Sequence, residues 1–239
     1  MALEDILSRI DLLQKEVEGL RPIDKERIEK LKQQLISEGL AAIERKKPLP
    51  FLPNKIGLIT GANSDAEKDV LQNAKLRWPE VQIEVIHTHV QGDKAVGEIL
   101  FAMDQLDAMA EVDLIIIARG GGRFQDLLPF SDERLVRAAA NLSKPFISAI
   151  GHENDSPLLD LVADLRASTP TDAAKRAVPD VVEERRNLDI ALQRIRYRIG
   201  SFLDAQQQLI AGIISRPVIE SPYGFVDGQD DLLSQLKKR

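Results

Sequence analysis

Between Lys55 and about Ala177, apolar runs of strand length alternate with segments in which apolar residues recur every three or four positions. The runs lack polar alternation, which is typical of strands covered on both faces. Strands that alternate with helices in this way indicate a parallel sheet. We therefore predict an α/β fold with a mostly parallel sheet and helices on both faces, in a Rossmann-like three-layer core. The predicted strands are Ile56 to Thr60, Val81 to Val90, Asp113 to Ala118 and Phe146 to Ile150, and the predicted helices lie near Asp65 to Arg77, Ala95 to Ala108 and Asp132 to Asn141.

The segment before this core has a helical pattern. Its first part ends at Pro22 and carries a short heptad stripe formed by Leu3, Ile6, Ile10, Leu13, Val17 and Leu20. A second helix is predicted to be capped by Asp24 and closed by Gly39, with an apolar face formed by Ile28, Leu31 and Leu35. The basic, proline-containing stretch ERKKPLPFLP then marks a boundary.

After Pro179 the sequence is helical and charged, with a heptad-like apolar stripe formed by Leu188, Leu192, Ile195, Ile199, Phe202, Leu209 and Ile213. A stripe of this length without a second one predicts a projecting arm that needs a partner helix. The N-terminal stripe is one candidate partner, and association of copies of the chain through these helices is another expectation. A short terminal helix follows the arm. We predict three parts, namely an N-terminal helical segment (1–44), an α/β core (45–178), and the helical arm with the C-terminal segment (179–239).

Composition adds limits to this picture. The chain has 239 residues, 44% of them hydrophobic, which is enough for one substantial α/β domain with additional helices. No apolar run is long enough to cross a bilayer and the N-terminus is acidic and amphipathic, so we expect neither a signal peptide nor a membrane partner. Because cysteine is absent, we expect a cytoplasmic protein. The formal net charge of −6 predicts that any contact with nucleic acid is local.

Polar or glycine-rich segments follow all four predicted strands, at the edge where parallel sheets bind ligands. These segments are Gly61 to Ser64, Gln91 to Asp93, Arg119 to Gly122 and Gly151 to Asp155. In the third segment, Arg119 precedes Gly120, Gly121 and Gly122. Glycine lets a backbone approach a ligand closely, and the planar guanidinium suits a phosphodiester. The triple glycine matches neither a dinucleotide-binding motif nor a Walker loop, so a tight structural turn is the alternative to an anion-binding loop.

His152 follows the last predicted strand, and Asp155 lies three residues later. A carboxylate close to an imidazole holds its tautomer and favours its protonated form, as general acid–base catalysis at neutral pH requires. The alternative is that Asp155 only caps a helix with Pro157 in its first turn, and that His152 is an ordinary loop residue.

Three further residues are weaker candidates. Asp69 lies on the helix after the first strand and near the same edge of the sheet, although acids early in a helix are expected for dipole reasons alone. His87 and His89 are two positions apart and therefore lie on the same face of a predicted strand, but two histidines without a third ligand make a poor metal site. We therefore predict no metal site.

Four stretches, in this order and spacing, resemble the large subunit of exonuclease VII, and they are KKPLPFLPNKIGLIT, VQG, ARGGGRFQDLLPFSDE and AIGHENDSPLLDLVADLRASTPTDAA. The resemblance runs from about Leu31 to Arg239 and is dense from Lys46 to Glu184. It implies an enzyme that cuts single-stranded DNA into short oligonucleotides from either end and requires no divalent metal or other cofactor. It also implies that several copies of a small helical subunit bind through the arm.

The resemblance assigns residues to this chemistry as well. The residues that match the catalytic positions of the family are Asp69, Arg119, His152 and Asp155. It implies that His152, oriented by Asp155, acts as general base or acid while water attacks the phosphodiester. Arg119 and the amides of the glycine loop would stabilise the pentacovalent anion. Gln91 and the glycines Gly120, Gly121 and Gly122 would bind the phosphates.

This sequence also departs from the pattern of the family. GANSDA replaces the usual SPTGAA, Arg123 replaces a serine, and Leu128 replaces a tryptophan. We expect no OB-fold before Lys46 of the kind with which the family binds single strands. Two other kinds of function therefore stay open, namely a nucleotide- or phosphate-binding α/β module without turnover, and an inactive scaffold that acts through its helical segments.

Overall fold

The computed structural model describes residues 22–121, 124–150, 157–216, 219 and 223–238. The predicted N-terminal heptad stripe lies outside these residues. The chain divides after Val181 into two compact units, which we describe one at a time.

The first unit contains a five-stranded sheet in which every strand pairs in parallel, in the order β2-β1-β3-β4-β5. The strands are β1 (Lys55–Thr60), β2 (Gln82–His87), β3 (Leu114–Arg119), β4 (Phe146–Ile150) and β5 (Leu165–Arg166). This confirms the predicted parallel α/β fold. β5 was not predicted, because two residues are too few to form an apolar run. β2 ends at His87, three residues before the predicted end at Val90.

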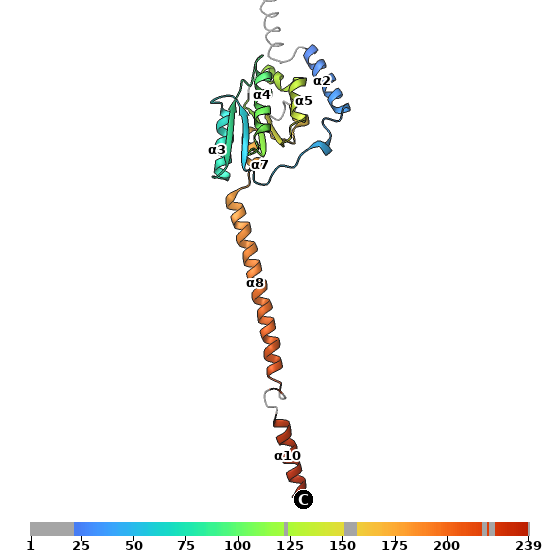
Figure 1. Ribbon diagram of the computed structural model, residues 1–239, viewed down its shortest axis with the longest axis vertical. Coiled ribbons are helices and arrows are strands. Elements are labelled where there is room, and N and C mark those ends of the chain that lie inside the picture. The colour runs from blue at the N-terminus through green and yellow to red at the C-terminus, as the bar shows by residue number, and fades with distance from the viewer. Residues whose placement is uncertain (1–21, 122–123, 151–156, 217–218, 220–222, 239) are drawn as a thin grey trace, which may run out of the picture. The chain divides into compact units, whose positions relative to one another are not determined.

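Helices cover both faces of the sheet, as predicted (Figure 1). Alternate residues of β3 separate the two cores, because successive strand side chains point to opposite faces. Ile115 and Ile117 pack with α4 (Ala95–Ala108) and α5 (Glu133–Ala140). Leu114 and Ile116 pack with α3 (Asp65–Arg77) and α7 (Pro170–Ala177). All four of these β3 side chains are buried, so both faces of the central strand are dry.

The helix before the core, α2 (Pro22–Ser37), packs on the side of the sheet that carries α5. Leu35 is fully buried there, as its place in the predicted apolar face requires. The helix ends as predicted at Gly39, whose φ of 76° suits glycine. Leu40 N–H donates to Leu35 O (3.1 Å) and Gly39 N–H to Ile36 O (2.9 Å), which is the Schellman arrangement. The predicted cap Asp24 instead lies inside the helix, because Pro22 already fits a first turn.

An ion pair joins the end of α2 to α5. Arg137 Nη1 and Nη2 donate to the two carboxylate oxygens of Glu38, at 2.6 and 3.0 Å. These bonds, with a further one from Gln34, lower the pKa of Glu38 to about 2 from an ordinary value of 4.5. A folded-state pKa below the unfolded one means that the pair stabilises the fold above pH 4.5, and that this stabilisation is lost as the pH falls toward 2.

We expect Glu38→Gln to lower the urea midpoint of unfolding at about pH 7 and to have a smaller effect at about pH 3, where much of the advantage of the wild-type carboxylate has already been lost. The measurement is the difference in midpoint between the two proteins across this pH range. A difference that stays constant with pH would show that the carboxylate charge does not hold α2 in place.

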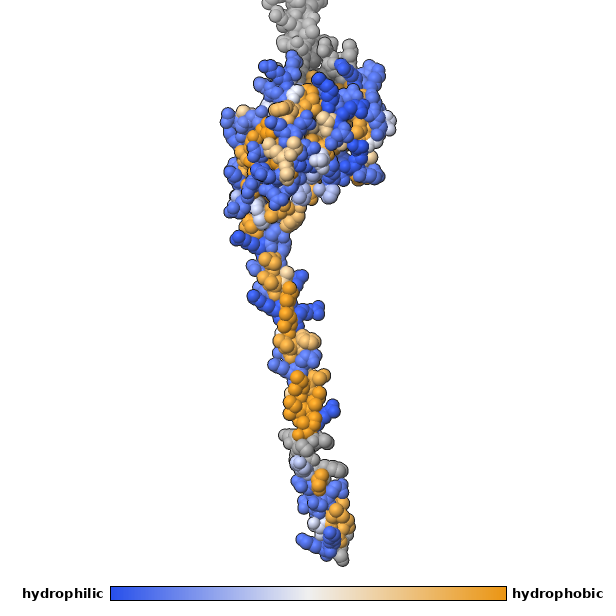
Figure 2. Space-filling model, viewed as in Figure 1, coloured by the Kyte–Doolittle hydropathy of each residue, from blue (hydrophilic) through white to orange (hydrophobic). Residues whose placement is uncertain are grey.

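The second unit consists of the larger part of α8 (Val181–Ile214) and of α10 (Gly224–Lys237). Both helices were predicted from the sequence. No described side chain of α8 is buried. The predicted apolar stripe is exposed throughout, from Leu188 at 60% to Ile213 at 40%, and Figure 2 shows apolar surface along this helix. None of the described helices is both long and apolar enough to cross a membrane.

Candidate active site

Arg119 is the last residue of β3 and lies against the last residue of β4, because the two strands pair in parallel with Arg119 opposite Ile150. Its side chain is only 5% exposed. Nη2 donates to Oδ2 of Asp126 at 3.2 Å, and Asp126 belongs to the 3-10 helix η2 (Phe124–Ser131) that follows the glycine loop. Nη1 is buried and has no hydrogen-bond partner in the described part of the chain. The fold thus holds a nearly dry guanidinium, and one of its terminal nitrogens is unmatched within the described ranges.

Gly120, the first residue of the glycine loop, lies close to the first turn of α3. A Cβ on Gly120 would lie 3.9 Å from both the Cβ and the backbone nitrogen of Ala66. That is ordinary contact, and the φ of Gly120 is not positive, so neither crowding nor backbone strain requires glycine at this position. At this position the backbone lies close to a helix N-terminus, where amide N–H groups favour the binding of an anion. Gly121 is exposed, and Gly122 lies outside the described residues.

The first turn of α3 is fixed by local hydrogen bonds. Ser64 caps it by accepting from Glu67 N–H (3.1 Å), and Asn63 N–H donates to the Glu67 carboxylate (2.7 Å). Asn63 has a φ of 56°, which asparagine tolerates better than most residues. Asp69 is exposed on the same helix, three residues after Ala66 and therefore on a neighbouring part of the helix surface. Within the described residues, no hydrogen bond or ion pair joins Asp69 to Arg119.

The end of β4 leads to the other two predicted catalytic residues. His152 and Asp155 lie in 151–156, outside the described residues, so their roles stay predictions. On the near side, Ile150 is buried beside Arg119. On the far side, Leu158 N–H donates to Ser131 Oγ at the end of η2 (3.1 Å). Ile150 and Leu158 are therefore held by β3 and η2, the two elements that carry Arg119 and Asp126.

The side chain of Asp160, on α6 (Leu159–Val162), is nearly buried and contacts β4. Asp160 accepts from Ser148 Oγ (2.5 Å), and its other oxygen lies 2.9 Å from Nε of Arg166 on β5. Burial raises the pKa of Asp160, while Ser148 and Arg166 act in the opposite direction. This cluster ties β4, α6 (Leu159–Val162) and β5 together.

Comparison with known proteins settles the family. Residues 40–239 match the protein family described as exonuclease VII, large subunit. The chain belongs to the exonuclease VII large-subunit family. It is 57% identical over 214 residues to the exodeoxyribonuclease 7 large subunit of Clavibacter michiganensis, covering 90% of this chain and 49% of that protein. It is 53% identical over 204 residues to the protein of the same name from Streptomyces griseus, covering 85% of this chain and 51% of that protein. The chain thus spans about half the length of these relatives.

In this exonuclease VII family member, the two histidines of β2 and its following loop have separate partners. His87 Nε2 lies 2.9 Å from Glu67, and the bond to His87 lowers the pKa of that glutamate. His89 lies two residues beyond the end of β2, contrary to the prediction that both histidines share a strand face. Its backbone N–H and Nδ1 both contact Glu98 at 2.8 Å. Among the described residues, no three His, Asp, Glu or Cys side chains gather as metal ligands would.

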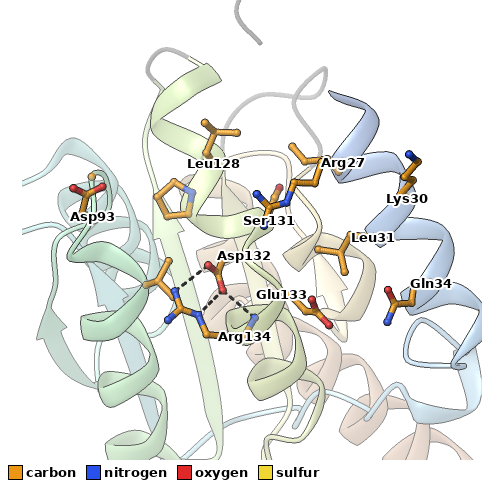
Figure 3. A pocket seen from close by; sticks show the side chains of 14 residues that line it. Arg27, Lys30, Leu31, Gln34, Asp93, Leu128, Ser131, Asp132, Glu133 and Arg134 are labelled. Carbon is orange, nitrogen blue, oxygen red and sulfur yellow. Dashed lines mark hydrogen bonds and ion pairs between the residues drawn. The ribbon is translucent and has the colours of Figure 1, made fainter. Parts of the chain in front are cut away.

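Gln91 lies in the loop after β2, and its side chain is exposed. β1 separates β2 from β3 in the sheet, and the described contacts do not join Gln91 to Arg119. The next two residues of this loop border a pocket of about 840 Å³ between α2, η2 and the start of α5 (Figure 3). Its lining includes neither Arg119 nor the glycine loop. Arg134 is the cation at the start of α5, and it is already paired with Asp132 at 3.1 Å.

The sequence did not single out Asp126, whose carboxylate accepts a hydrogen bond from Arg119 in the structure. The residue stands inside the family-like stretch ARGGGRFQDLLPFSDE, but it is seven positions after Arg119 in a stretch with no clear period. Only a prediction that η2 folds back onto β3 would have found the pair. Asp160 was missed for a similar reason, because its partners Ser148 and Arg166 lie on two different strands.

Proposed function

We propose that the chain is the catalytic part of an exodeoxyribonuclease, which hydrolyses phosphodiester bonds of single-stranded DNA to short oligonucleotides without a metal ion or other cofactor. One observation carries most weight, namely the buried guanidinium of Arg119, whose Nη1 has no hydrogen-bond partner among the described residues. A buried donor without an acceptor is costly, and a phosphate oxygen is an acceptor that would remove the cost. The names of the relatives support the reaction class.

The proposed chemistry is attack of water on phosphorus. The water oxygen forms a bond to phosphorus as the bond from phosphorus to the leaving deoxyribose oxygen breaks. His152, oriented by Asp155, takes a proton from water or gives one to the leaving oxygen. Arg119 and the backbone amides of the glycine loop stabilise the extra negative charge of the pentacovalent state. Asp69, near the start of α3, positions the water or His152, and Gln91 with Gly120, Gly121 and Gly122 binds phosphates of the strand.

The proposed partner is the small subunit of exonuclease VII, in several copies, bound by the helical arm. The apolar side chains of α8 are exposed along its length, with Phe202 at 62% and Leu209 at 60%. A continuous apolar stripe on a helix is typical of a surface that packs against another helix. Association between copies of the chain through the same stripe is the competing arrangement.

The experiment that tests the function is degradation of end-labelled single-stranded DNA in excess EDTA, with and without the small subunit. We expect short labelled products in EDTA, and much slower loss of a duplex of the same sequence. Cleavage only when Mg²⁺ is added would contradict the metal-free mechanism. Absence of cleavage in every lane, with the small subunit present, would contradict the nuclease proposal and favour a phosphate-binding or scaffold role.

A further inference from the structure

Two charged side chains meet where β3 is followed by the glycine loop and η2. Arg119, with 5% of its side chain exposed, donates from Nη2 to Oδ2 of Asp126 at 3.2 Å. Asp126 is less deeply buried, with 35% of its side chain exposed. It lies in the first turn of η2, which starts at Phe124. The ion pair therefore connects both ends of the glycine loop, because one member precedes the glycines and the other follows them.

The two terminal nitrogens of Arg119 have different surroundings. Nη2 has the Asp126 carboxylate, whereas Nη1 is buried without a hydrogen-bond partner among the described residues. The guanidinium is a rigid plane, so a carboxylate that holds one terminal nitrogen also sets the direction of the other. The structure thus keeps one nitrogen occupied and leaves the other without an acceptor in the part of the chain that it describes.

We propose that Asp126 is a positioning residue of the nuclease site. The inference rests on the proposed function, in which Arg119 binds the scissile phosphate. The carboxylate of Asp126 holds the guanidinium in the orientation that presents Nη1 to a nonbridging phosphate oxygen. It also neutralises the buried arginine while the site contains no phosphate. Asp126 itself does not contact the DNA, and acts through Arg119.

Two simpler roles of Asp126 make different predictions. A carboxylate that merely stands near the DNA repels phosphates, so removing its charge would strengthen binding of single strands. A carboxylate that only supports the fold would lower the melting temperature when removed, without changing kcat or Kd of the folded protein. Positioning predicts slower cleavage and weaker binding, although a repulsive charge has been removed. The sign of the change in Kd therefore separates the three roles.

The test uses two substitutions in the full chain together with the small subunit. Asp126→Asn keeps the shape of the side chain and removes its charge. Asp126→Glu keeps an anion beside the buried arginine, so it remains folded even where Asp126→Asn does not, but it displaces the carboxylate. We expect each substitution to lower kcat for single-stranded DNA by about 10–100-fold. This is the size of the loss when a residue that orients a functional side chain is replaced, as known for the residues that orient metal ligands in metalloenzymes. KM should rise less than kcat falls, because the interaction with the phosphate is stronger in the transition state than in the bound substrate.

Binding is measured in parallel by titrating fluorescently labelled single-stranded DNA with each protein. This measurement gives Kd also for variants that cleave too slowly for kcat to be determined. Asp126→Asn is expected to bind more weakly than wild type. Added to Arg119→Ala, it should change neither kcat nor Kd further, because its effect passes through the missing guanidinium. The matched control is Asp132→Asn, which removes the charge of another aspartate paired with an arginine, Arg134 at 3.1 Å, and should leave kcat near the wild-type value.

Three results would overturn the positioning role. They are wild-type cleavage and binding by both Asp126 variants, tighter binding by Asp126→Asn, and additive effects of Asp126→Asn and Arg119→Ala. A different result would overturn the proposed function itself, namely absence of cleavage by the wild-type chain in the presence of the small subunit. The two failures are therefore distinguishable within one set of proteins.

Discussion

Arg119→Ala is expected to slow cleavage of single-stranded DNA by about 10²–10³-fold, the usual cost of removing one donor that stabilises a developing oxyanion. The side chain is 5% exposed and one of its terminal nitrogens has no partner among the described residues. A donor held in a dry site stabilises charge more than it would in water. The measurement is the single-turnover rate with labelled DNA in EDTA, beside the thermal unfolding curve of the variant.

The variant should remain folded, because Asp126 is 35% exposed and its carboxylate can turn to water once the arginine is gone. Arg119→Lys should fall between wild type and alanine, since lysine keeps the charge but lacks the planar fork. The matched control is Arg176→Ala in the last turn of α7, where Nε lies 3.0 Å from Asp172 and half of the side chain is exposed. Equal rates for Arg119→Ala and Arg176→Ala would show that Arg119 does not act on the phosphate.

The parts of the fold that could be predicted from sequence are those with a local signal. The apolar run of β3 is dry on both faces, so its composition alone indicates a central strand. Glycine at position 39 closes α2 because of a local backbone requirement. Arg119 could be placed at the ligand-binding edge because that edge follows from strand direction, and the structure puts it at the end of β3.

The parts that could not be predicted depend on contacts between distant segments. β5 is recognisable only through its pairing with β4. The partner of Arg119 depends on the path of η2, and a 3-10 helix that contains Pro129 has no helical period to guide the prediction. His89 leaves the face that alternation assigned to it, because β2 ends at His87 and the loop brings His89 to Glu98. Sequence thus placed Arg119 at the carboxyl end of a strand, but it did not predict the ion pair with Asp126.

His152→Ala is expected to have the largest effect on activity, with a loss of about 10²–10⁴-fold in kcat, because proton transfer by a positioned side chain contributes this much. The described structure supplies a reason to test this histidine rather than the others. β4 ends at Ile150, which pairs with Arg119, and the sequence places His152 two positions later. His87 and His89 are each already paired with a glutamate, at 2.9 and 2.8 Å.

The control for this substitution is His89→Ala, which removes a largely exposed histidine from the same edge of the sheet and should leave kcat within about twofold of wild type. Added imidazole should restore part of the activity of His152→Ala, because a small base that enters the vacated space can carry the proton, and it should not affect Arg119→Ala. Rescue of one variant and not the other would separate proton transfer from charge stabilisation at the same phosphate. If His152→Ala cleaves at the wild-type rate in EDTA, the proton is carried by another group, and Asp69 on α3 becomes the residue to substitute next.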